Sequence, residues 1–327
     1  MRRALAGVAA AALAASLLIG GDAQAARHRP PTRCGPQTHL VSGSTRGAGA
    51  IPVLLVHGFQ GSPRDFAKTV DGGPTLRSTL PGLPGVALYT FDYAAYSKNW
   101  VTNPSIGPAL AQAITCLHAR SGRRVVVVAH SMGGLATRFA QGQIIRGRAV
   151  ADAISRVVTI GTPNRGVILL SIANGEVSNL LVRAATEAAA AGCDEPPPKP
   201  RRDLCELLRA ASIPAVQAMD PRSLRLAALP RWNPRLAVDG VAADLRLRLS
   251  AFGLGTTVSL GDVVVTVESA TASANPRTRR FVVRCRAELT DLVDVVDESH
   301  CSHANELSNH RIVRHVVAQV QAAQRLT

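Results

Sequence analysis

Short apolar runs, separated by polar loops, recur along the chain after residue 50. Four of them predict strands of a sheet: residues 51–56, 86–91, 124–129 and 154–160. The first is a continuous apolar run, as expected of a strand buried on both faces. Helical spacing of apolar residues predicts helices over 104–120, with Pro104 suited to the first turn, and over 135–145. This alternation of strands and helices predicts an α/β fold, with a mostly parallel central sheet covered by helices on both faces.

The pattern changes after residue 163. Residues 164–215 contain no strand pattern, and a Pro-rich stretch interrupts them at 194–200. Because connections of this length are usually functional, we predict a cap or lid over the carboxyl edge of the sheet. A disordered surface insertion is the alternative.

Further elements are predicted on either side of this region. Strand signals return at 245–252, 263–267 and 281–285, a helix is expected over 309–324, and a short helix near 64–70. Residues 26–50 are expected to be irregular.

The first 25 residues have the layout of a secretory signal peptide. Arg2 and Arg3 precede an apolar run over residues 4–19, and Ala23-Gln24-Ala25 forms a small-x-small cleavage site. An uncleaved membrane anchor is the alternative, although the run is shorter than the ~20 residues that a span requires. We therefore expect residues 26–327 to be a secreted, extracellular protein that folds as one domain with the cap inserted.

Six cysteines follow the expected cleavage site. An even number in a secreted chain favours disulfides. Cys193–Cys205 and Cys285–Cys301 would close short loops, which leaves Cys34–Cys116 by elimination. A zinc site is the competing interpretation, but the sequence has no CxxC pair with a histidine at ligand spacing, so no metal or other cofactor is predicted.

The formal net charge is +15, and aromatic residues make up 3% of the chain. A strongly basic secreted protein is attracted to anionic surfaces such as a cell wall or lipid head groups. The sequence shows neither a helix-turn-helix nor zinc-finger spacing, so a nucleic-acid partner is not expected. We expect a monomer.

A candidate nucleophile lies where the strand 124–129 runs into Ala129-His130-Ser131-Met132-Gly133 and then a helix. A serine on a sharp strand-to-helix turn exposes its hydroxyl above the sheet edge. Small residues are needed two positions before and after it, because the turn brings neighbouring backbones together. The sequence therefore predicts that Ser131 is a nucleophile, and a purely structural turn is the alternative.

A serine nucleophile needs a histidine base and an acid that orients it, in the chain order Ser, acid, His. His303 is the preferred base, because Cys301 would anchor its loop. His300 is the main alternative, and His310 would lie inside the last helix. Asp262, beside a glycine that allows a turn, is the preferred acid. The alternative acids, all of which could simply be solvated, are Asp239, Asp244, Asp291 and Asp294.

An oxyanion intermediate requires two backbone N–H donors. Met132, directly after the candidate nucleophile, should supply one, and Phe59 in the His57-Gly58-Phe59 loop should supply the other. His57 precedes Ser131, so we expect it to organise this loop.

Five sequence blocks together resemble the secreted triacylglycerol lipase/esterase family of bacteria, within the α/β-hydrolase superfamily. They are His57-Gly58-Phe59, Ala129-His130-Ser131-Met132-Gly133-Gly134, Gly161-Thr162-Pro163-Asn164-Arg165-Gly166, Gly261-Asp262-Val263-Val264 and Ser302-His303-Ala304-Asn305-Glu306-Leu307. The resemblance spans roughly residues 50–320. Two departures are Ala129, where glycine is commoner, and the long Cys-containing stretch between Asp262 and His303.

The resemblance implies an α/β-hydrolase fold, acyl-ester or lipid substrates, and a triad of Ser131, Asp262 and His303. It also implies Phe59 and Met132 as oxyanion donors. An envelope acyltransferase with the same triad is the first alternative function. A non-catalytic binding protein on the same fold is the second.

Overall fold

The computed structural model describes residues 33–45, 47, 49–167, 213–251, 254–272, 280–288 and 299–325. The expected signal peptide, residues 168–212 of the expected cap, and the Cys193–Cys205 pair lie outside these ranges.

The main sheet has eight strands in the described part of the chain: β1 (Thr38–Leu40), β2 (Ile51–Val56), β3 (Val86–Phe91), β4 (Val125–His130), β7 (Ile154–Ile160), β8 (Ala237–Ala251), β9 (Leu254–Ser259) and β10 (Arg280–Glu288). The strand order is β1-β3-β2-β4-β7-β8-β10, with β9 paired to β8. β1 and β9 are antiparallel to their neighbours and the other pairings are parallel, so the predicted mostly parallel sheet is confirmed. A separate ribbon pairs β5 (Ile144–Ile145) with β6 (Arg148–Ala149).

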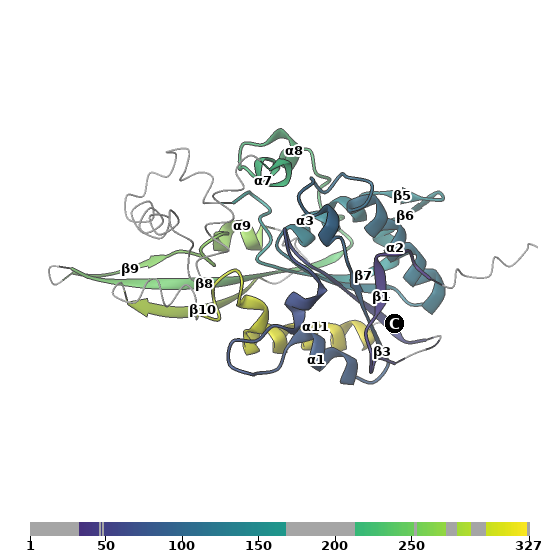
Figure 1. Ribbon diagram of the computed structural model, residues 1–327, viewed down its shortest axis with the longest axis horizontal. Coiled ribbons are helices and arrows are strands. Elements are labelled where there is room, and N and C mark those ends of the chain that lie inside the picture. The colour runs from purple at the N-terminus through teal and green to yellow at the C-terminus, as the bar shows by residue number, and fades with distance from the viewer. Residues whose placement is uncertain are drawn as a thin grey trace, which may run out of the picture. The chain divides into compact units, whose positions relative to one another are not determined.

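Helices cover both faces of the sheet (Figure 1). The α-helices described are α1 (Leu76–Thr79), α2 (Gly107–Ser121), α3 (Met132–Gln141), α7 (Pro214–Ala218), α8 (Leu224–Ala227), α9 (Val267–Thr271) and α11 (His310–Arg325). α2 and α3 bury their apolar side chains in a core on one face, and α1 and α11 in a core on the other. The β2 residues alternate between these cores, which is why the strand reads as a continuous apolar run.

The carboxyl ends of β2, β4 and β7 meet at one edge of the sheet. His57 follows β2, Ser131 follows β4 and Gly161 follows β7. β8 continues past this edge and folds back as β9, which brings the chain to Asp262 beside the same strand ends. The topology therefore concentrates the predicted chemistry at one place.

Around Asp262 the sequence prediction was wrong, because residues 263–267 do not form a strand. The carboxylate oxygen Oδ1 of Asp262 accepts hydrogen bonds from the amides of Val264 (2.9 Å) and Val265 (2.6 Å). These amides are therefore not available to donate to a neighbouring strand, and the chain turns here. Val263 has a φ of 78°, a strained value for a β-branched residue.

Other element boundaries also differ from prediction. The helix expected over 135–145 begins at Met132 and ends at Gln141, and Ile144–Ile145, expected at its end, pair instead with Arg148–Ala149 in the β5–β6 ribbon. The helix expected over 104–120 begins at Gly107, so Pro108 and not Pro104 occupies its first turn. Near residue 64 the chain forms the short 3₁₀ helix Pro63–Ala67, and β1 lies within the stretch expected to be irregular.

Two of the predicted disulfides are present, Cys34–Cys116 and Cys285–Cys301. Such cross-links suit an oxidising compartment. Among the helices that the structure describes, none is both long and apolar enough to cross a bilayer.

Candidate active site

Ser131 stands at the turn between β4 and α3 in a strained backbone conformation, with φ 53° and ψ −129°. Hydrogen bonds fix this turn: its N–H donates to the carbonyl of Ile160 (2.9 Å), and its carbonyl accepts from Oγ1 of Thr162 (3.1 Å). The side chain is 8% exposed. The strand-to-helix elbow that the sequence predicted is therefore present.

Close backbone packing explains the glycines around the elbow. A Cβ on Gly133 would collide with the carbonyl oxygens of His57 and Val56. A Cβ on Gly58 would lie 2.8 Å from that of Ser131. The loop after β2 can therefore lie directly against the nucleophile turn only where both positions lack a side chain.

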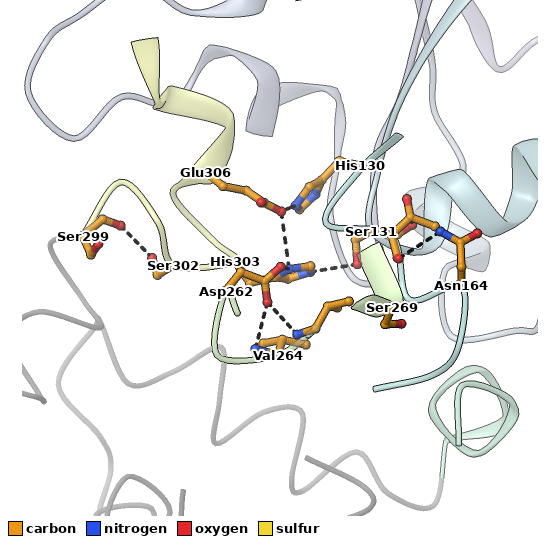
Figure 2. Close-up of polar contacts among 12 residues, drawn as sticks. His130, Ser131, Asn164, Asp262, Val264, Ser269, Ser299, Ser302, His303 and Glu306 are labelled. Carbon is orange, nitrogen blue, oxygen red and sulfur yellow. Dashed lines mark hydrogen bonds and ion pairs between the residues drawn. The ribbon is translucent and has the colours of Figure 1, made fainter. Parts of the chain in front are cut away.

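Ser131, His303 and Asp262 form a hydrogen-bonded chain (Figure 2). The Nδ1 atom of His303 lies 2.8 Å from Oδ2 of Asp262, and its Nε2 atom lies 2.8 Å from Oγ of Ser131. A carboxylate only accepts, so Nδ1 carries the proton and Nε2 is left to accept the hydroxyl proton of the serine. This arrangement can activate a serine hydroxyl.

The loops that carry the acid and the histidine are tied together through their backbones. The N–H of His303 donates to the carbonyl of Asp262 (2.9 Å). Cys301, two residues earlier, is bonded to Cys285 on β10. Asp262 is 1% exposed, and both of its carboxylate oxygens accept hydrogen bonds.

The two predicted oxyanion donors flank Ser131. Met132 is the first residue of α3, so its N–H has no acceptor within the helix. Phe59 follows Gly58, which touches Ser131. Within the described residues, neither N–H donates to a protein acceptor.

His57 organises the loop that holds Phe59, as expected. Its ring stacks on Tyr93 with centroids 4.1 Å apart. Its Nε2 accepts from the N–H of Tyr93 (3.1 Å), so its Nδ1 donates to the carbonyl of Gly58 (2.9 Å). Burial lowers the pKa of His57, which keeps the ring in this neutral tautomer.

A cavity of about 170 Å³ opens onto Ser131 and His303. Its apolar lining includes Phe59, Val167, Met219, Val264 and Leu307. The lining also includes the polar side chains of Gln60, Asp65, Lys68 and His130, so the nucleophile faces a pocket of mixed character with an apolar part.

A family model described as "Alpha/beta hydrolase family" matches residues 53–314, most of the chain. This chain belongs to the alpha/beta hydrolase family. The match includes the Ser131 elbow, Asp262 and His303.

Two curated relatives of this hydrolase are triacylglycerol lipases. The lipase of Burkholderia plantarii is 32% identical over 127 residues, which cover 38% of this chain and 33% of the relative. The lipase of Pseudarthrobacter phenanthrenivorans is 32% identical over 123 residues, which cover 37% of this chain and 36% of the relative. The chain thus spans about a third of the length of the curated relatives it matches.

Solved structures bear out the fold. The mature form of lipase BlEst2 from Bacillus licheniformis superposes with a TM-score of 0.53 at 15% identity, over 86% of this chain and 97% of that one. The propeptide form of the same lipase gives 0.50 at 15% identity, over 85% of this chain and 53% of that one. At this identity the likeness concerns the architecture of the hydrolase alone.

The alternative site residues lie elsewhere or have other partners. His300 faces Asp71, with 3.5 Å between Nε2 and Oδ2, and His310 is the first residue of α11. Asp239 pairs with Arg156, and Asp244 accepts from Arg246 (3.0 Å). Asp291 and Asp294 lie outside the described residues.

The sequence did not single out two buried residues beside this chain, Glu306 and His130. Oε1 of Glu306 lies 3.2 Å from Nε2 of His130 and 3.6 Å from Nδ1 of His303 (Figure 2). Polar atoms of these three residues all lie within 4.8 Å of one another, close enough to share a cation. The one signal available in the sequence was that Glu306 stands three residues after His303.

Proposed function

We propose that the protein is a secreted carboxylic ester hydrolase, a lipase or esterase, with Ser131, His303 and Asp262 as its triad. The observation that carries the proposal is the unbroken hydrogen-bonded chain from Asp262 through His303 to Ser131, which lines a cavity with an apolar part. The lipase names of the two curated relatives support an acyl-ester substrate.

Acylation begins when Nε2 of His303 takes the hydroxyl proton of Ser131 and Oγ attacks the ester carbonyl. The amides of Phe59 and Met132 stabilise the oxyanion, helped by the positive end of α3. Asp262 stabilises the imidazolium through Nδ1. The intermediate collapses, the proton passes from Nε2 to the departing alkoxide, and the alcohol leaves.

Deacylation repeats these steps with water. His303 takes a proton from a water molecule, the resulting hydroxide attacks the acyl carbonyl, and the carboxylic acid leaves as Oγ regains its proton. The chemistry needs only the chain's own side chains and backbone amides. Apolar residues such as Val167, Met219 and Leu307 are suited to the acyl chain.

Residues 164–215 are proposed as the cap over this pocket. Both described flanks of the stretch reach the site region, because Val167 and Met219 line the cavity and the N–H of Val167 donates to the carbonyl of Met219 (3.0 Å). A stretch anchored at the pocket mouth can gate the entry of substrate.

A basic face supports the proposed attraction to anionic surfaces. Arg246 and Arg248 on β8 share a face with Arg284 and Arg286 on β10, as their register requires. Asp244 lies on the same face and pairs with Arg246 and Arg284, so the arginines outnumber it. The side chains of Arg248, Arg284 and Arg286 are exposed. Sedimentation with anionic and with neutral vesicles tests this, and binding that is equal for both or insensitive to salt would refute it.

The function is tested with a fluorophosphonate probe and a series of esters of increasing chain length, each assayed below and above its solubility limit. We expect labelling of the wild-type protein at Ser131 and none of Ser131→Ala. A rate that rises sharply above the solubility limit identifies a lipase, and one that saturates below it identifies an esterase. A folded wild-type protein that neither labels nor hydrolyses any ester would refute the proposal.

A further inference from the structure

Glu306 is a buried acid that the proposed mechanism does not use. It is 0% exposed, and within the described residues neither carboxyl oxygen makes a hydrogen bond of good geometry. The facing atom, Nε2 of His130, is also buried and unpartnered among those residues. Leaving buried polar groups unpaired costs free energy, so we look for a proton or an ion shared between these two atoms, which lie 3.2 Å apart.

The fold makes room for this acid beside the triad. Gly161, at the end of β7, has a φ of 52°. A Cβ at this position would collide with Oε1 of Glu306 and lie 2.9 Å from Oδ2 of Asp262. The glycine therefore lets two carboxyl groups approach the same side of His303.

The charges around Glu306 decide its protonation. Three groups face Glu306 directly: His130 at the end of β4, Asp262 in the loop after β9, and His303 on its own loop. His57 and Lys68 act electrostatically on His130 from farther away. Burial raises the pKa of Glu306 well above its ordinary value, and the charge of Asp262 raises it further, while the amide of Ala243 opposes the shift. Burial also lowers the pKa of His130 well below its ordinary value. Both shifts favour the neutral forms of the two groups, in which Nε2 of His130 can accept a proton that Glu306 holds.

Resting on the proposed function, we propose that Glu306 is a positioning residue: as a neutral carboxylic acid it donates to Nε2 of His130 and leaves Asp262 as the single anion facing His303. The rings of His130 and His303 lie with centroids 4.8 Å apart, so the fixed His130 ring limits the movement of His303. A second anion beside Nδ1 would favour the imidazolium before substrate arrives, and His303 could then no longer accept the serine proton.

A divalent cation held by Glu306, His130 and His303 is the competing occupant. It would replace the proton on Nδ1 of His303 and so break the 2.8 Å bond to Asp262. The two occupants therefore differ in their response to added Zn²⁺ and to a chelator.

The experiment compares Glu306→Gln, which keeps a neutral donor of the same shape, with Glu306→Leu, which removes it. Asp244→Asn, a buried carboxyl on β8 outside the site, is the matched control. We expect Glu306→Gln to keep kcat/KM on a soluble short-chain ester, and the midpoint of its acid limb, close to the wild-type values. Glu306→Leu should lower kcat roughly 10- to 100-fold, as loss of a residue that orients a functional side chain does, with little change in KM.

Proton NMR of the resting enzyme gives a readout that needs no turnover. The downfield Nδ1 proton of His303 should persist in wild type, Glu306→Gln and Asp244→Asn, and should broaden or shift in Glu306→Leu. If the wild-type protein hydrolyses no ester, the proposed function fails while this signal still reports on Glu306.

Three results would overturn the inference. An acid limb that moves down by a pH unit or more in Glu306→Gln would mean that Glu306 is ionised. Kinetics and NMR signals of Glu306→Leu equal to those of Asp244→Asn would remove the positioning role. Inhibition of the wild type, but not of Glu306→Gln, by stoichiometric Zn²⁺, reversed by a chelator, would assign the site to a cation.

Discussion

Two regions of the molecule meet at the site and hold their residues by different means. The elbow region, at the ends of β2 and β4, fixes Ser131 by two hydrogen bonds and, in addition, by backbone packed on backbone where Gly58 and Gly133 leave no room for a side chain. The acid–base region, residues 260–309, fixes Asp262 and His303 by hydrogen bonds and a disulfide. Close backbone contacts leave no room for a larger side chain, whereas loops held by hydrogen bonds can shift slightly when a residue is changed. We therefore expect abrupt losses from changes in the first region and graded ones in the second, except at His303 itself.

The largest expected effect is the same in both regions, because it comes from loss of a triad side chain. Ser131→Ala and His303→Ala should each lower kcat by roughly 10⁴- to 10⁶-fold, because triad members act as a unit. His300→Ala and His310→Ala should retain most activity, since neither contacts Ser131. Ester hydrolysis and thermal melts of the four variants check this. A His300→Ala protein that is inactive beside an active His303→Ala protein would move the base to His300.

The sequence predicted the elbow region well because its signals are local. β2, β3 and β7 occur at the predicted residues, and β4 is displaced by one, since each is a short segment in which apolar residues predominate. The first half of β8 was missed because residues 237–244 are rich in Ala, Gly and Asp, and pairing with β7 and β10 makes them a strand.

The acid–base region depended on contacts between distant segments. Residues 263–267 have strand-like composition, yet the carboxylate of Asp262 takes their amides. His303 and Asp262 were identified from motif and chain order. Glu306 begins the short 3₁₀ helix Glu306–Ser308, in a polar stretch of sequence with no periodicity, so its burial follows from tertiary packing alone. The signal peptide, the cap and the Cys193–Cys205 disulfide stay predictions.

The two disulfides separate stability from activity. Loss of Cys34–Cys116, which spans 82 residues, should cost about 4 to 5 kcal/mol of unfolding free energy, and loss of Cys285–Cys301, which spans 16, about 3 kcal/mol. Activity should respond in the opposite order, because Cys301 anchors the loop of His303. Denaturant melts and kcat of the two double Cys→Ser variants test this. A more active enzyme without Cys285–Cys301 than without Cys34–Cys116 would contradict it.

Overpacking tests the steric character of the elbow. Gly133→Ala places a methyl group against the carbonyl oxygens of His57 and Val56, so we expect a loss of roughly 1 to 3 kcal/mol in stability. Turnover should fall with it, because the oxyanion loop must move. Gly82→Ala, where a Cβ would meet no neighbour within 4 Å, is the control. If the two variants match in melting temperature and kcat, the close contact at Gly133 does not constrain the elbow.

The smallest expected effect is a pH dependence of stability to which both regions contribute. Burial lowers the pKa of His57 and His130 at the elbow and of His315 on α11. These rings stay neutral in the folded protein, while the unfolded chain takes up protons below its ordinary value of 6.5. Their contribution is therefore complete above that pH and is lost as the pH falls.

The contribution of Glu306 to stability changes with pH in the opposite direction. Its raised pKa favours the folded state below the ordinary carboxyl value of 4.5, and this contribution declines as the pH rises above it. With three histidines against one carboxyl, the melting temperature should rise from pH 5 to pH 7. His315→Gln should flatten this slope and leave kcat unchanged, because His315 stacks on Phe281 (4.0 Å) away from the site. An unaltered slope in thermal melts of His315→Gln would show that His315 does not contribute to the pH dependence, and that the neutral histidines of the elbow carry it.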